Sequence, residues 1–129
     1  MKSWSDFTEA VALGAQRTGP TFFMAERGKH GEWLTNPIGA AIEVTLGLDT
    51  MQKEATAHHH GLFEGHAITE LIKLFPFLGE PLPQGLRAYV GISSCTWQSL
   101  IDWFWSEGLF DDRVKCVNFV AWLYEGQVD

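Results

Sequence analysis

The segment NPIGAAIEVTLG, residues 36–47, decides how the rest of the chain is arranged. Asn36 is a favoured helix N-cap, and Pro37 suits the first helical position because its missing N–H is not needed there. Only two side chains between Pro37 and Gly47 are polar, and glycine is common at the end of a helix. Because a helix that is apolar almost all round has to be buried, we predict a central helix over residues 37–46.

A further helix is predicted on each side of this central segment. Residues 4–17 repeat apolar side chains every three or four positions, and Ser3 with Asp6 has the spacing of a capping box. The amphipathic repeat returns over residues 66–75, where Pro76 ends it. Each segment therefore has one apolar face that can pack on the central helix.

The C-terminal third of the chain predicts two more helices. Thr96 is a suitable N-cap for an apolar repeat over residues 97–107. Asp111 or Asp112 has the side chain to cap a final helix, which we expect to end just before Gly126. Both helices carry several aromatic residues, so their packing bears on function as well as on fold.

The segments between these helices have weaker patterns. Residues 21–35 contain two short β-type runs around the turn-like sequence GKHG at 28–31, which predicts a β-hairpin. Residues 86–92 fit a strand or a helix, and residues 49–65 show no regular pattern. We therefore predict a single domain of mainly α (α+β) class, with about five helices packed around the central apolar helix and one small hairpin near residues 21–35.

The composition excludes several classes of function. The chain has 129 residues and a formal charge of −7, with 46% apolar and 19% charged residues, and its basic side chains are scattered. Nonspecific binding to nucleic acid or to an anionic membrane needs a basic surface, so we expect neither. No apolar run approaches the roughly 20 residues of a membrane span, and the first residues lack the apolar core of a secretory signal. We therefore expect a cytoplasmic protein, and since no nucleotide-binding loop motif occurs we expect no cofactor.

The histidines are the first candidate for chemistry. His58, His60, Glu64 and His66 carry the imidazole and carboxylate groups that bind zinc or nickel. No two of these histidines have the i, i+4 spacing of a helical metal site, although an extended chain would place His58 and His60 on one face. We favour a solvated run of histidines and keep a small metal-binding protein as an alternative function.

Cys95 is the second candidate, since a thiol at a helix N-terminus has a lowered pKa and can act as a nucleophile. The sequence Cys95-Thr96-Trp97 resembles the C-T-W at the nucleophile of CHAP-type amidases. In that family the catalytic histidine follows the cysteine, whereas here all five histidines precede it. We therefore interpret Cys95 and Trp97 as packing residues and keep a cysteine-dependent enzyme as an alternative.

The aromatic residues of the two C-terminal helices are the third candidate. Over residues 97–107 they widen the apolar face to roughly 200°, where an ordinary surface helix needs about 100°. In the last helix Trp122 falls between polar residues, on the side that should face solvent. Tryptophan is enriched at binding hot spots, and nearby acids favour a partner with a basic, apolar groove. The residues assigned to this protein-binding surface are Trp103, Trp105, Trp122, Asp102, Asp111 and Asp112.

Three segments resemble small uncharacterised proteins of bacteria and their bacteriophages. Residues 5–10, 37–41 and 121–125 occupy, in the same order, the places of an S-F-x-E-A helix, a C-A-L-G-A-A helix and a closing A-D-W-L-E helix. The cysteine before Gly-Ala-Ala and the paired-cysteine loop of some members are missing here. The resemblance implies no activity and favours a phage or mobile-element origin.

These observations together predict a non-enzymatic protein that binds another protein through an aromatic, acid-rimmed C-terminal surface. The expected setting is a phage-encoded regulator or inhibitor of a host protein machine. Self-association through the same surface is an alternative, beside the metal-binding and cysteine-dependent enzymes above. An acidic mimic of nucleic acid is a further alternative, which we disfavour because only 19% of the residues are charged.

Overall fold

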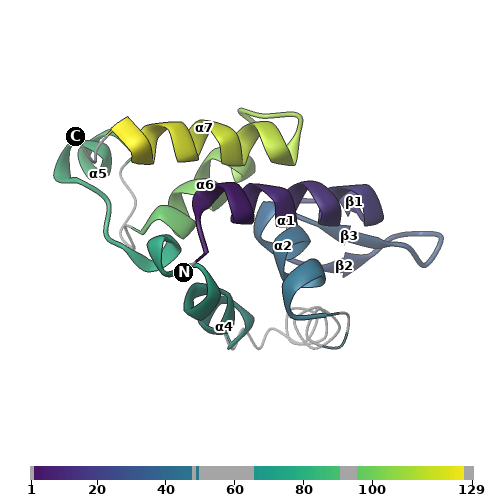
Figure 1. The fold of residues 1–129 in the computed structure, drawn as a ribbon. Helices are drawn as coiled ribbons and strands as arrows, with labels where there is room; N and C mark the ends of the chain where they lie inside the picture. Colours follow the sequence, from purple (N-terminus) through teal and green to yellow (C-terminus); the bar gives the residue numbers. More distant parts are fainter. Residues whose placement is uncertain (1, 48, 50–65, 91–95, 127–129) are drawn as a thin grey trace.

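The computed structural model describes residues 2–47, 49, 66–90 and 96–126 (Figure 1). These residues are mainly helical and include a small three-stranded sheet, which confirms the predicted mainly α (α+β) class. No helix within these ranges combines the length and the apolar character needed to cross a membrane. The helices are α1 (Trp4–Arg17), α2 (Pro37–Thr45), α4 (His66–Leu74), the 3-10 helix η1 (Pro76–Gly79), α5 (Gln84–Val90), α6 (Trp97–Ser106) and α7 (Arg113–Gly126).

The central helix is α2, as the sequence predicts. It lies between α1 and α4 and also contacts α6 and α7 (Figure 1). Its residues from Pro37 to Glu43 are all buried. Asn36 caps the helix by accepting a hydrogen bond from the Gly39 N–H at 2.8 Å, and Gly47 follows it with a φ of 96°. The nearly apolar segment therefore forms the centre of the core.

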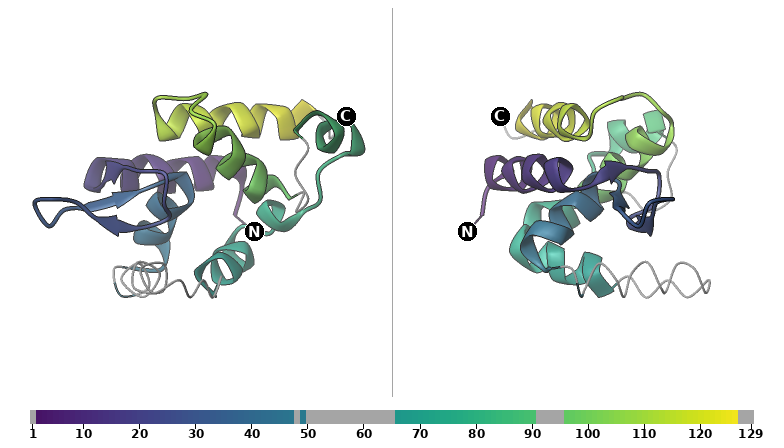
Figure 2. Two further views of the ribbon diagram at one scale, coloured as in Figure 1. Left: turned by 180° about the vertical axis from the view of Figure 1, so that it is seen from behind. Right: turned by 90° about the vertical axis from the view of Figure 1, so that its right-hand side faces the viewer.

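Helix α1 lies between α2 and α7, and it runs in the opposite direction to α7 (Figure 2). The predicted capping box forms, because the Ser3 hydroxyl accepts from the Asp6 N–H at 3.2 Å and the Asp6 carboxylate accepts from the Ser3 N–H at 2.9 Å. Gly14 allows α1 and α2 to approach closely, since a Cβ there would lie 2.0 Å from the Ala40 carbonyl oxygen. The result is a tight α1–α2 pair with α7 packed across it.

The sheet differs in part from the predicted hairpin. Strands β2 (Glu26–Arg27) and β3 (Trp33–Thr35) pair antiparallel around the expected turn, and β1 (Gly19–Pro20) adds a parallel partner on the other side of β3. The Thr21–Ala25 segment, expected to be the first strand of the hairpin, is irregular. Its backbone instead bonds to the end of β3 and the start of α2, where the Asn36 N–H donates to the Phe23 carbonyl at 2.9 Å.

The C-terminal helices are capped as the sequence predicts. The Thr96 hydroxyl accepts from the Ser99 N–H at 3.2 Å at the start of α6. Asp112, rather than Asp111, caps α7, because its Oδ1 accepts from the N–H groups of the next helical turn at 2.8 and 3.1 Å. Helix α7 continues through Gly126, one residue beyond the expected end. The undecided segment around residues 86–90 is helical and belongs to α5.

Arg113, the first residue of α7, bonds to the C-terminal end of α1 and to the sheet. Its side chain is buried, and burial lowers its pKa. The guanidinium meets the carbonyl end of α1, which carries partial negative charge, so the position suits a cation. The hydrogen bonds run from Nη1 to Thr18 Oγ1 (2.9 Å), Gly19 O (3.1 Å), Thr35 Oγ1 (2.8 Å) and Thr35 O (3.4 Å), and from Nη2 to Ala15 O (3.1 Å) and Thr18 O (2.8 Å).

Candidate functional site

The most exposed aromatic side chain of the C-terminal helices is Trp122 on α7, with 66% of its surface accessible. The prediction that Trp122 faces solvent is therefore confirmed. Its ring lies 5.9 Å from that of Phe119, which is itself 37% exposed. Phe119 in turn contacts the ring of Phe110 at 5.5 Å. We call Phe110, Phe119 and Trp122 the aromatic face.

A groove between α1 and α7 lies directly beside this face. It has a volume of about 360 Å³, and Trp122 lines it together with residues of both helices. Two exposed carboxylates also line it, Glu9 from α1 and Glu125 from α7. No lysine, arginine or histidine of the described residues lines the groove. We call it the α1–α7 groove, and its charge is negative.

Trp105, in contrast, is not part of any exposed surface, which corrects the prediction. Only 6% of the residue is accessible, and its indole N–H donates a hydrogen bond to the Thr21 carbonyl at 2.7 Å. Trp103 is half-buried and lines a different hollow from Trp122. The physical reason is that α6 packs against α2, α7 and η1 within the molecule. Its wide apolar arc therefore serves the protein's own core.

The predicted acidic rim is also only partly correct. Asp111 and Asp112 are exposed, but Asp112 caps α7 and Asp111 lies 3.9 Å from Lys115 in an ion pair. Asp102 is not at the rim at all, because it points into the second hollow. The carboxylates that line the groove together with Trp122 are those of Glu9 and Glu125. Glu9 is polar and on the outer face of its helix in the sequence, but nothing in the sequence indicates that α1 and α7 are neighbours.

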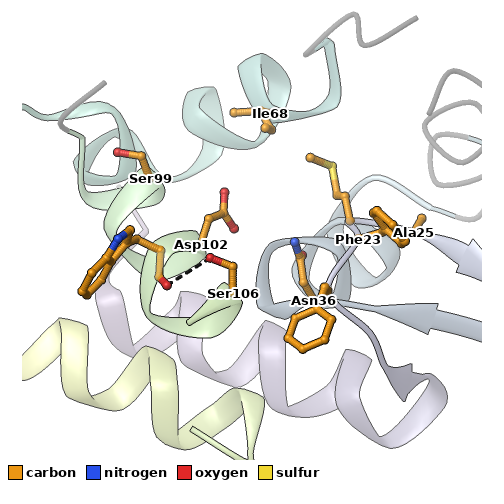
Figure 3. Close-up of a pocket in the computed structure, with 10 residues that line it drawn as sticks. Phe23, Ala25, Asn36, Ile68, Ser99, Asp102 and Ser106 are labelled. Atoms are coloured by element: carbon orange, nitrogen blue, oxygen red, sulfur yellow. Dashed lines mark hydrogen bonds between the residues drawn. The ribbon is translucent and has the colours of Figure 1, made fainter. Parts of the chain in front are cut away.

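The second hollow lies between α6, α4 and the irregular residues 22–25, and we call it the Asp102 pocket. Its volume is also about 360 Å³. Figure 3 shows Asp102 extending from α6 into this space, with Ile68 of α4 across from it and Phe23 and Asn36 along one side. Most of the other lining side chains are apolar or aromatic. The pocket therefore surrounds one carboxyl group with a largely apolar wall.

The carboxyl group of Asp102 is incompletely paired. Its Oδ2 accepts a hydrogen bond from the Gln98 amide one turn earlier, whereas Oδ1 is buried and has no hydrogen-bond partner in the described part of the chain. Burial raises the pKa of this carboxyl group to about 7, and the Gln98 hydrogen bond opposes that rise. Asp102 therefore changes charge near neutral pH.

The candidates for metal and thiol chemistry lie largely outside the described residues. This applies to His58, His60, Glu64 and Cys95, and to the side chain of His66. Within the described ranges, no group of three or more His, Cys, Asp or Glu side chains could hold a metal ion. Cys116 of α7 is buried, and burial raises the pKa of its thiol to about 12. That thiol is therefore protonated at neutral pH and is a poor nucleophile.

Comparison with known proteins found no matching family model, no matching curated protein and no matching solved structure. The resemblance of three segments to small phage proteins therefore stays a prediction.

Proposed function

We propose that this protein binds another protein through the aromatic face and the α1–α7 groove. The observation that carries the proposal is the exposure of Trp122, 66% of whose surface contacts water. A tryptophan offers a large apolar area with few rotatable bonds, so its burial by a partner gains much free energy for little loss of conformational entropy. Trp122 adjoins the ring of Phe119 and lines the α1–α7 groove, so it belongs to a continuous surface and is not an isolated exposed side chain, which fits a binding role.

The neighbouring residues favour such a role because they hold the tryptophan in place. The rings of Trp122 and Phe119 are tilted by only 33° and lie 5.9 Å apart, so one supports the other. Phe119 is anchored in turn by the mostly buried Phe104 of α6, at 5.4 Å. An anchor that is ordered before binding loses less entropy when the complex forms.

The charge around the groove indicates the chemistry of the partner. Glu9 and Glu125 flank Trp122, and the whole chain carries a formal charge of −7. A partner with a basic, apolar groove complements this surface and would be attracted to it over long range. A second copy of the chain would bring the same carboxylates together across a symmetric interface, which electrostatics disfavours.

The biological setting is proposed from the sequence resemblance alone. A phage-encoded regulator or inhibitor of a host protein machine would act by occupying a basic groove on that machine. A nucleic-acid mimic would need carboxylates in phosphate-like rows, whereas the groove presents two carboxylates beside a tryptophan. The aromatic centre therefore favours a protein groove over a nucleic-acid site as the surface that is bound.

The test is a comparison of two variants that each remove one exposed aromatic side chain. Trp122→Ala removes the proposed anchor, and Phe22→Ala removes a ring of nearly equal exposure, 65%, on another side of the molecule. A partner is captured from a bacterial lysate, identified, purified and titrated with each variant. We expect Trp122→Ala to weaken binding by about 30-fold or more, as for a hot-spot residue, with Phe22→Ala within about twofold of the wild type.

Thermal unfolding separates this loss of binding from a loss of fold. Because Trp122 is on the surface, its replacement should change the free energy of unfolding by less than about 0.5 kcal/mol. Equal binding by Trp122→Ala and the wild type would contradict the proposal. Sedimentation that shows a dimer of the wild type, lost in Trp122→Ala, would identify a second copy as the partner instead.

A further inference from the structure

The Asp102 pocket is separate from the surface that carries the proposed function. It opens between α6, α4 and residues 22–25 (Figure 3). The α1–α7 groove, in contrast, lies between the first and last helices. No described residue lines both hollows. A ligand of the pocket would therefore be recognised independently of a protein partner.

The pocket has the size and walls of a small-molecule site. Its volume of about 360 Å³ falls at the lower end of the range for ligand pockets, roughly 300–1,000 Å³. Phe22, Phe23 and Met24 form one side, and Ile68 and Trp103 contribute from α4 and α6. Phe22 and Phe23 are 65% and 43% exposed, so both rings have area that a ligand could cover. Such walls suit an organic molecule with an apolar body.

One oxygen of the carboxyl group in the pocket lacks a hydrogen-bond partner among the described residues. Oδ1 of Asp102 is a buried acceptor with no hydrogen bond from the described residues. Leaving such an acceptor unpaired destabilises the protein, because the atom has lost its water and gained no donor. A ligand that donates a hydrogen bond to Oδ1 would remove this cost on binding.

The residues around Asp102 indicate which charge a ligand that donates a hydrogen bond to Oδ1 should carry. No lysine, arginine or histidine is among the described lining residues, so the described part of the chain supplies no cation here. On α7, Cys116 interacts electrostatically with Asp102 but keeps its proton. On α4, Glu70 and Lys73 pair with each other at 3.0 Å and do not line the pocket. A cationic donor would thus meet an unneutralised carboxylate.

We propose that the Asp102 pocket binds a small organic cation, made of an aromatic or branched apolar body and one ammonium head that donates to Oδ1 of Asp102. The apolar body would lie against Phe22, Phe23 and Trp103. The ammonium stabilises the carboxylate form of Asp102, so binding strengthens as pH rises through the range in which that group loses its proton.

The experiment uses 2-phenylethylamine as the probe and 2-phenylethanol as its neutral counterpart of nearly the same shape. Each is titrated into the full chain by calorimetry or ligand-detected NMR at pH 5 and pH 8. At pH 8 we expect the amine to bind about tenfold or more tightly than the alcohol, because its hydrogen bond is charge-assisted. At pH 5 the preference should nearly vanish, since Asp102 is then neutral.

Two variants with the same change of charge locate the effect. Asp102→Asn keeps the shape of the side chain and removes the carboxylate, whereas Glu107→Gln removes an exposed carboxylate just after α6, outside the pocket. Asp102→Asn should lower the affinity for the amine about tenfold and abolish its pH dependence. Glu107→Gln should bind as the wild type does.

Three results would overturn the proposal. The first is equal affinity for amine and alcohol at pH 8, which the wild-type chain alone can reveal. The second is an equal loss of amine binding in Glu107→Gln and Asp102→Asn, which would reflect net charge rather than the pocket. The third is no detectable binding of the amine at millimolar concentration. None of these results depends on whether Trp122→Ala still binds a protein.

Discussion

The α1–α7 groove and the Asp102 pocket have the same volume, about 360 Å³, and each combines carboxyl groups with aromatic rings. They differ in the solvation of the charge. Glu9 and Glu125 are exposed in the groove, so water and salt screen them and they act mainly by steering a partner. Asp102 has a buried oxygen with no partner in the described part of the chain, so it acts at short range on whatever enters the pocket. The solvation of the carboxyl groups therefore distinguishes the α1–α7 groove, which suits a macromolecule, from the Asp102 pocket, which suits a small ligand.

A row of aromatic rings connects the two regions. Trp103 of the pocket contacts Phe104 at 5.3 Å, Phe104 contacts Phe119 at 5.4 Å, and Phe119 contacts Trp122 at 5.9 Å. The row crosses from α6 to α7 through the packed interface of the two helices. Because two other rings separate Trp103 from Trp122 in this row, we expect substitutions at these two residues to have nearly additive effects.

Replacing Arg113 should disrupt the α1–α7 groove and the Asp102 pocket together. It has the largest expected effect on the free energy of unfolding. Arg113→Met keeps much of the apolar stem but removes every hydrogen bond to the end of α1 and to the sheet. Thr18 and Thr35, which would lose this donor, are buried, so we expect a loss of roughly 3–5 kcal/mol in the free energy of unfolding. Urea denaturation measures it.

A matched arginine variant provides the control for this prediction. Arg87 is exposed, and its Nε donates a hydrogen bond to the Leu82 carbonyl at 2.9 Å. Arg87→Met should cost less than about 1 kcal/mol. If both arginine variants lost equal stability, the Arg113 network would not be what holds α7 to α1.

Asp102→Asn should act on the pocket alone and stabilise the protein at alkaline pH. Burial raises the pKa of Asp102 from 3.8 to about 7, so between these values the folded chain keeps a proton that the unfolded chain has lost. Stability therefore falls as pH rises from about 4 to about 7, and the neutral amide avoids this fall. With allowance for partial access to water, we expect a gain of about 2–3 kcal/mol at pH 8 and almost none at pH 4. Unfolding curves at both values test the difference, and an equal effect at the two pH values would contradict a buried, titrating Asp102.

Tyr124→Phe should leave binding at both the α1–α7 groove and the Asp102 pocket measurably unchanged. The Tyr124 hydroxyl donates to Glu80 Oε2 at 2.6 Å, and this hydrogen bond, together with burial, raises the pKa of Tyr124 to about 12. The bond is exposed, so its loss should cost less than about 1 kcal/mol. The Tyr124 ring keeps its contact with Trp4 at 5.4 Å, beside the groove. Affinity of the variant for the captured partner and for 2-phenylethylamine should match the wild type, and a large loss of either would show that the hydroxyl positions α7.

The helices could be predicted from the sequence because their signals are local. Ser3 with Asp6, Asn36 with Pro37, and Thr96 each act within one helical turn, and their hydrogen bonds are all present. The strand expected at residues 21–25 was wrong because strand pairing depends on residues distant in the chain. Here Gly19–Pro20 takes the place beside β3, although Gly-Pro is typical of a helix end.

The candidate site could be predicted only in part for the same reason. The exposure of Trp122 could be predicted because its neighbours on the helix are polar. The burial of Trp105 and Asp102, in contrast, depends on which elements cover α6. Glu9 was missed because no local pattern shows that α1 and α7 are neighbours. Arg113 looked like one of several scattered basic residues, since its acceptors lie as many as 98 positions earlier in the sequence.

The contacts of Arg113 also set the order of events during synthesis of the chain. Thr18 leaves the ribosome 95 residues ahead of Arg113. At the usual rate of translation this delay is roughly 5–20 s, during which the carbonyl groups of Ala15 and Thr18 lack their guanidinium donor. The end of the first helix therefore gains its full set of native hydrogen bonds only after residue 113 has been synthesised.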